Sequence, residues 1–65
     1  MEKLIEYCEY ELTCIKRYGV DPNQATTRCF GAVMFFSLEH PDLSEEVGDW
    51  WDCKMHPKFR ELGGV

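Results

Sequence analysis

Proline and glycine positions divide this chain of 65 residues into three segments. Gly19 is suited to end a first helix, because glycine readily takes the left-handed backbone conformation found at many helix C-termini. Asp21 and Pro22 then supply an N-cap acid followed by a proline at the first helical position. Pro41 ends this second helix, since the residue before a proline is disfavoured in helical conformation. The pattern predicts three helices with short connections, and no segment alternates as a strand does.

Apolar residues recur at helical spacing in each segment. The first segment places four of them on one face: Leu4, Cys8, Leu12 and Ile15. The second segment does the same with Ala25, Cys29, Val33 and Phe36. The third begins with a capping-box pattern at residues 42–45 (DLSE), and its apolar face carries Val47, Trp51, Met55 and Leu62. Each segment therefore has a face that is suited to a common core.

We expect one all-α domain over residues 1–65. Its architecture is predicted to be a small three-helix bundle with helices at about 2–18, 22–39 and 43–62, the third kinked or broken at Pro57. The segment 22–39 also carries Phe30, Met34 and Leu38 on a second face, with Phe35 between the two faces. A helix that is apolar nearly all round is buried on most sides. We therefore expect it to lie between the other two helices, with some surface left for another subunit.

The charge balance narrows the class of partner. The chain has 12 acidic and 7 basic residues, so its net charge is −5, which argues against nucleic acid and anionic membrane as partners. Its most apolar run, residues 29–37, is far shorter than the roughly 20 residues of a membrane-spanning helix. The N-terminal residues have no pattern of a secretory signal. We expect a soluble, cytoplasmic protein whose partner is another protein, a second copy of itself, or both.

Aromatic residues outside the expected core are the candidates for an interaction surface. Tyr7, Tyr10 and Tyr18 form a second stripe on the first helix, together with Cys14. Trp50 is rotated by about 100° from Trp51 and falls at the edge of the core. These residues and Phe35 would supply apolar anchors, because tyrosine and tryptophan are enriched in binding surfaces. The alternative for each residue is that it covers the edge of the core.

The four cysteines do not form a metal-binding or redox motif by spacing, since no two are separated by only two residues. Cys8 and Cys29 fall on core faces. Asp49, Cys53 and His56 follow one another at i, i+4 and i+7, and their side chains are suitable metal ligands. A solvated helix face gives the same spacing, so we expect no metal and no cofactor. A metal-binding or thiol-based sensor using Cys53 and His56 is the alternative function.

Residues 15–28 (IKRYGVDPNQATTR) resemble the turn of a helix-turn-helix, which makes a DNA-binding regulator a further alternative. Arg28 stands where that motif buries an aliphatic residue, and the net charge lacks the electrostatic footprint of DNA binding. No serine or cysteine nucleophile has a positioned base, so we do not expect an enzyme. The predicted function is stoichiometric binding by a small acidic accessory protein, an inhibitor or regulator of a larger partner.

Overall fold

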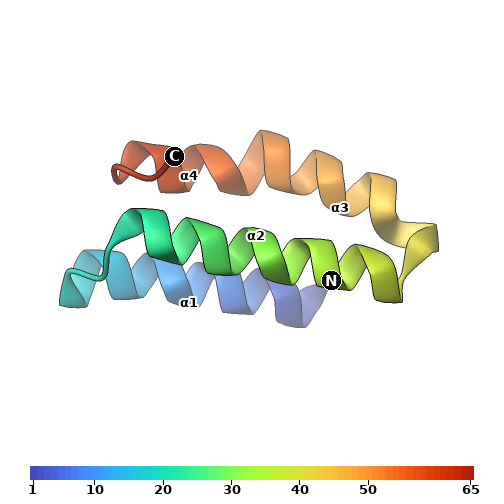
Figure 1. Ribbon diagram of the computed structural model, residues 1–65, viewed down its shortest axis with the longest axis horizontal. Coiled ribbons are helices and arrows are strands. Elements are labelled where there is room, and N and C mark those ends of the chain that lie inside the picture. Colours follow the sequence, from blue (N-terminus) through green and yellow to red (C-terminus); the bar gives the residue numbers. More distant parts are fainter.

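The computed structural model describes all 65 residues, and the chain is an antiparallel three-helix bundle without strands. Helix α1 spans Glu2–Tyr18 and α2 spans Pro22–Glu39. The third helical segment consists of a 3₁₀ turn at Pro41–Leu43, α3 at Ser44–Trp50, a π-helical turn at Trp51–Met55 and α4 at His56–Glu61. Figure 1 shows α1 and α2 side by side, with the third segment running back along them. The predicted fold class and helix bounds are confirmed.

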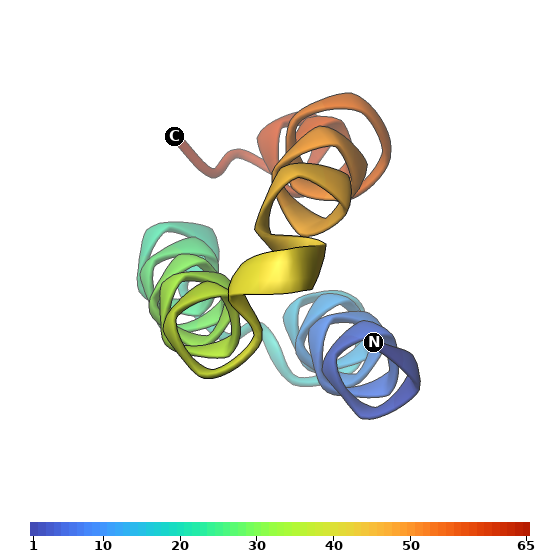
Figure 2. The same ribbon diagram turned by 90° about the vertical axis from the view of Figure 1, so that its right-hand side faces the viewer.

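The three helical segments lie at the corners of a triangle when the bundle is viewed from its end (Figure 2). This arrangement differs from the expected one, in which the second helix lies between the other two. Each segment turns one face to the common axis, so α2 buries only the face that carries Ala25, Cys29 and Val33. The expectation that α2 is buried on most sides is wrong, because two neighbours in a triangle cover only one side of a helix.

The core contains most of the faces predicted for the three segments, while Phe36 and Leu62 are only partly buried against it. Eleven buried residues form one cluster: Leu4, Cys8, Leu12, Ile15, Ala25, Cys29, Val33, Val47, Trp51, Met55 and Phe59. Phe59 has no exposed surface and is the largest fully buried side chain. Its ring lies 5.8 Å from that of Trp51, centroid to centroid. The C-terminal segment therefore supplies the aromatic part of the core, while α1 and α2 supply mostly aliphatic and thiol side chains.

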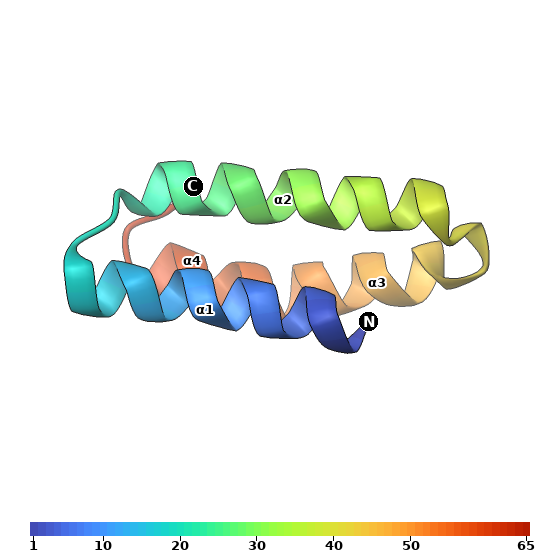
Figure 3. The ribbon, with the colours of Figure 1, turned by 90° about the horizontal axis from the view of Figure 1, so that it is seen from below.

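The connection between α1 and α2 forms as its residues predict. Gly19 has a φ of 69°, and its N–H donates to the Ile15 carbonyl, which ends α1 in the left-handed region. The Asp21 carboxylate accepts a hydrogen bond from the Asn23 N–H at 3.1 Å and caps α2. Figure 3 shows this connection at one end of the bundle and the α2–α3 connection at the other. The chain is thus a simple up-down-up bundle.

The start of the third helix differs from the predicted capping box. Residues Pro41–Leu43 form a 3₁₀ turn, and no side chain caps α3. The Leu43 N–H donates to the His40 carbonyl, and the Ser44 N–H donates to the Pro41 carbonyl. Backbone carbonyls therefore accept the hydrogen bonds of N–H groups that a Ser or Asp side chain would otherwise cap.

The third helix is interrupted directly before Pro57, as the sequence predicts, and the chain continues in helical conformation to Glu61. The π-helical turn directly precedes this proline, and there the His56 N–H donates to the Trp51 carbonyl, five residues earlier. In a continuous α-helix the ring of Pro57 would clash with the Cys53 carbonyl. The wider turn inserts one residue at this point and relieves that clash. Trp51, Met55 and Phe59 consequently all remain buried along one line.

Candidate binding surface on α2

Four large apolar side chains of α2 lie in solvent on the side away from the core. The exposed fractions are 49% for Phe30, 51% for Met34, 64% for Phe35 and 78% for Leu38. Phe30, Met34 and Leu38 follow at steps of four residues and form one stripe along the helix. We call these four residues the α2 outer face. No helix of the chain is long and apolar enough to cross a membrane.

The α2 outer face is uncharged along its whole length. Arg28 and Glu39 bound it in sequence, and no charged residue lies between them. Gly31 falls within the face, and a methyl group added there would meet no atom within 4 Å. With on the order of 200 Å² for each large side chain, the four exposed fractions correspond to roughly 500 Å². That area lies in the upper part of the range for the largest apolar patch of a monomer, about 300–600 Å², and such patches are often functional.

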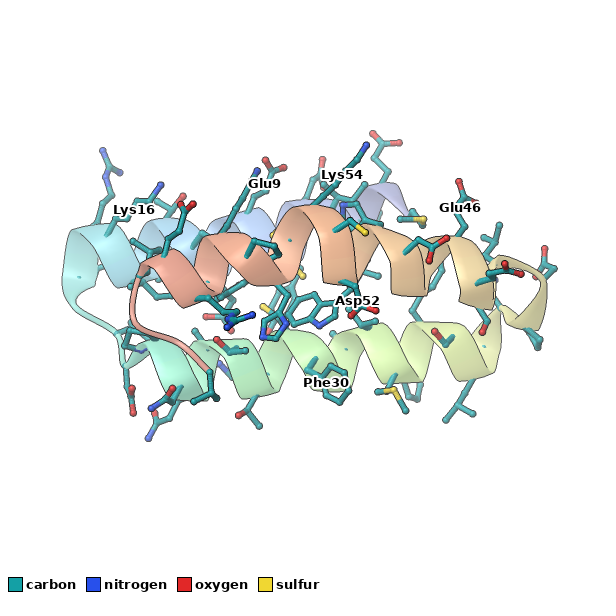
Figure 4. The ribbon with its side chains drawn as sticks, turned by 90° about the horizontal axis from the view of Figure 1, so that it is seen from above. Glu9, Lys16, Phe30, Glu46, Asp52 and Lys54 are labelled. Carbon is teal, nitrogen blue, oxygen red and sulfur yellow. The ribbon has the colours of Figure 1, made fainter.

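A shallow groove adjoins the outer face where α2 meets the third helical segment. The Phe30 ring lies 6.1 Å from that of Trp51. The other lining residues are Thr26, Thr27, Asp52, His56 and Val65. In Figure 4, Phe30 lies on α2 and Asp52 points from the π-helical turn toward that helix. Phe30 therefore belongs both to the outer face and to the rim of the groove.

An ion pair between the buried Glu11 and the partly exposed Arg28 joins α2 to α1. Glu11 is 5% exposed, and its carboxylate accepts hydrogen bonds from Arg28 Nε at 2.6 Å and Nη2 at 3.0 Å. The Tyr7 hydroxyl donates to the same carboxylate at 2.9 Å. Arg28 holds the pKa of Glu11 below its ordinary value, against the opposing effect of burial. Burial and the bond to Glu11 raise the pKa of Tyr7 to about 12. The network sets the relative position of the two helices, and none of its residues belongs to the α2 outer face.

The predicted interaction residues come from three helices. Tyr10, Tyr18 and Phe35 are largely exposed. Tyr7 is just over a third exposed and is hydrogen-bonded to Glu11, while Trp50 is half-buried against the core. Of this predicted set, only Phe35 belongs to the α2 outer face. Cys14, which the sequence placed on the tyrosine stripe, is buried.

The candidate metal ligands are not brought together. No group of three or more His, Cys, Asp or Glu side chains lies close enough to hold a metal ion. Asp49 and Cys53 are exposed, whereas the His56 ring stacks on Trp51 at 5.3 Å and donates from Nε2 to the Val65 carbonyl oxygen. The π-helical turn Trp51–Met55 contains Cys53 and ends just before His56, and it disturbs the i, i+4, i+7 spacing on which the candidate site depended.

All four cysteines are free thiols. Cys8 and Cys29 are fully buried in the core, on α1 and α2. A hydrogen-bonding interaction with Cys8, together with burial, raises the pKa of the Cys29 thiol. A thiol with a raised pKa is a poor nucleophile, so Cys29 acts as a small core side chain.

The α1–α2 pair also differs from a helix-turn-helix. The two helices of that motif cross at roughly 90–120°, whereas α1 and α2 lie antiparallel along their full length (Figures 1 and 3). Arg28 is engaged by Glu11.

A second groove, between α1 and α4, is lined mainly by polar residues of both charges, among them Glu9, Lys16, Lys58 and Glu61. Glu9 and Lys16 point away from α2 in Figure 4.

Three residues of the outer face were not predicted as interaction residues: Phe30, Met34 and Leu38. The signal for them was present in the sequence, because α2 has more apolar faces than two neighbouring helices can cover.

Comparisons of the chain with protein-family models, with curated proteins and with solved structures gave no match.

Proposed function

We propose that the protein acts by stoichiometric binding of another protein chain through the α2 outer face. The observation that carries this proposal is the exposure of Phe30, Met34, Phe35 and Leu38 on one side of an uncharged helical stretch. An amphipathic helix normally turns its polar residues to solvent. Here the solvent side is apolar, which is typical of a helix that contacts a partner.

The remaining features support a binding role in place of a chemical one. Both grooves are shallow, and no cluster of metal-ligating side chains accompanies them. The chain as a whole carries a net charge of −5. An acidic protein favours a partner with a basic or mixed surface and disfavours polyanions. Four free thiols are compatible with the reducing cytoplasm, where we place the protein. A small inhibitor or regulator of a larger protein fits this description.

The proposal predicts that a charge on the outer face abolishes partner binding while the fold persists. Met34→Glu introduces a carboxylate at the middle of the face, and because Met34 is already half exposed the fold should tolerate it. The measurement is the set of proteins that co-purify with the tagged chain from cells of its source. We expect one or more partners to bind wild type in stoichiometric amount and to be lost with Met34→Glu.

Tyr10→Glu is the matched control, since it changes the net charge equally at an exposed site on α1. Retention of every partner by Met34→Glu, with loss by Tyr10→Glu, would move the binding surface to the tyrosine stripe of α1 and contradict the proposal. Far-ultraviolet circular dichroism of both variants verifies that the helices remain intact.

A further inference from the structure

We propose that the α2 outer face binds a second copy of the same chain, in an antiparallel arrangement with its two-fold axis close to Met34. This inference rests on the proposed function, because it names the occupant of the same surface. A two-fold interface requires a patch that is complementary to its own inverted copy. The order of residues along α2 meets that requirement in two ways, through its apolar stripe and through the charges at its ends.

The apolar stripe is symmetric about its middle. Phe30 and Leu38 lie four residues on either side of Met34. When two α2 helices pack antiparallel about Met34, Phe30 of one copy faces Leu38 of the other, and the two Met34 side chains meet at the axis. Methionine is suited to this place because its flexible side chain adapts to the contact. Gly31 leaves open space within the face, into which a side chain of the second copy can fit.

The charges at the ends of the face are also complementary in this orientation. At about 100° per residue, Arg28, Phe35 and Glu39 lie on the same edge of α2, within about 40° of one another. Arg28 and Glu39 are turned about 120–140° from Met34, so they border the contact and do not lie in it. In an antiparallel pair related by a two-fold axis, this edge lies on the same side of both copies. Arg28 of one copy then lies at nearly the same height along the helix axis as Glu39 of the other. A parallel two-fold would instead put the two copies of this edge on opposite sides of the contact, so that Arg28 of one copy would have no Glu39 of the other beside it. Arg28 uses only two of its N–H groups on Glu11, and its side chain remains 44% exposed.

The area of the face is sufficient for a weak dimer. Two copies would bury roughly 1,000 Å² through the four outer-face residues of each, which is about the lower bound for a specific interface. A 65-residue chain also gains from a second subunit, because a domain of this size buries only about 60% of the surface that its unfolded chain exposes. We therefore expect a dissociation constant in the micromolar range and a reversible dimer.

Sedimentation equilibrium and cysteine cross-linking test this proposal together. Wild type should sediment as a monomer–dimer equilibrium. Met34→Glu places two carboxylates at the axis and should raise the dissociation constant by about a hundredfold, an effect typical of a change at the centre of an interface. Tyr10→Glu should leave it unchanged.

Cross-linking determines the orientation. Phe30→Cys and Leu38→Cys are made separately in a Cys53→Ser background, because Cys53 is the exposed native thiol. In the antiparallel dimer the two positions 38 are separated by about 12 Å along the helix axis, beyond the roughly 7 Å between Cα atoms that a disulfide spans. Mixing the two variants under mild oxidation should therefore give a mixed disulfide dimer rapidly, while each variant alone should cross-link slowly.

Rapid cross-linking of each variant with itself would indicate a parallel pair and overturn the inference. A dimer that survives Met34→Glu would place self-association on another surface and also overturn it. A wild-type chain that stays monomeric at high micromolar concentration would overturn it as well. If such a monomer still loses its co-purifying partner on Met34→Glu, the proposed function stands with a different protein as occupant. If no partner depends on Met34, both fail.

Discussion

Phe59→Ala is expected to unfold the protein or leave it barely stable at room temperature. Phe59 is the largest side chain with no exposed surface, and its removal leaves a cavity beside Trp51 that the short helix α4 cannot easily close. Truncation of a buried phenylalanine costs about 3–5 kcal/mol. A domain of this length has a total stability of about 3–10 kcal/mol, so the change removes most of it. The measurement is urea denaturation followed by circular dichroism.

Phe35→Ala provides the control for this prediction. The same atoms are removed from a side chain that is 64% exposed, so the expected loss in the monomer is below about 1 kcal/mol. Equal losses for the two variants would mean that Phe35 is covered in solution or that Phe59 is not at the centre of the core. Comparison at low protein concentration keeps any effect of self-association out of the result.

The second large effect concerns the ion pair between α1 and α2. Arg28→Met leaves the Glu11 carboxylate buried with Tyr7 as its remaining hydrogen-bond donor. Removal of one partner from a buried pair costs about 3–5 kcal/mol. Arg28 is partly exposed, so solvent already screens part of the interaction and we expect the loss at neutral pH to fall below that range. The double variant Glu11→Met/Arg28→Met should recover most of this loss, because it leaves no unpaired charge.

The loss should also depend on pH in a defined direction. In wild type, Arg28 lowers the pKa of Glu11 below its ordinary value of 4.5. The stabilisation from this pair is therefore complete above that value and decreases as the pH falls through the folded-state pKa. In Arg28→Met, burial raises the pKa of Glu11, and protonation then relieves the buried charge. The difference in unfolding free energy between the two proteins should be largest near neutral pH and shrink toward about pH 4. A difference independent of pH would show that packing of the Arg28 side chain causes it.

The helical pattern of this sequence predicted most of the fold because its signals are local. Gly19, Asp21 and Pro22 act within one turn, and the apolar faces of α1 and α2 follow from residue spacing alone. The π-helical turn was not predicted, because the pattern at Pro57 is equally compatible with a kink, an end or an inserted residue. The 3₁₀ turn at residues 41–43 was missed for a related reason: backbone carbonyls replaced the side-chain cap that the sequence suggested.

The exposed apolar face of α2 could be predicted less fully, because it depends on how the helices are arranged. The sequence indicated that α2 had surplus apolar area, but not which face would remain exposed. The tyrosines of α1 were selected because tyrosine is common in interfaces. The Tyr7 hydroxyl, however, donates to Glu11. The same carboxylate binds Arg28, which lies 17 positions further along the chain, so this contact depends on how α1 and α2 pack. The triangular arrangement of the three segments, which decides what α2 buries, is a tertiary property.

We propose that the α2 outer face is covered by another protein chain in the cell. Site-specific incorporation of a photo-reactive amino acid at position 34, and at position 10 as control, tests it directly. Irradiation in cells should give a discrete covalent adduct at position 34, either with a second copy or with another protein, and none at position 10. An adduct at position 10 with none at position 34 would contradict this proposal, as would the absence of adducts at both positions.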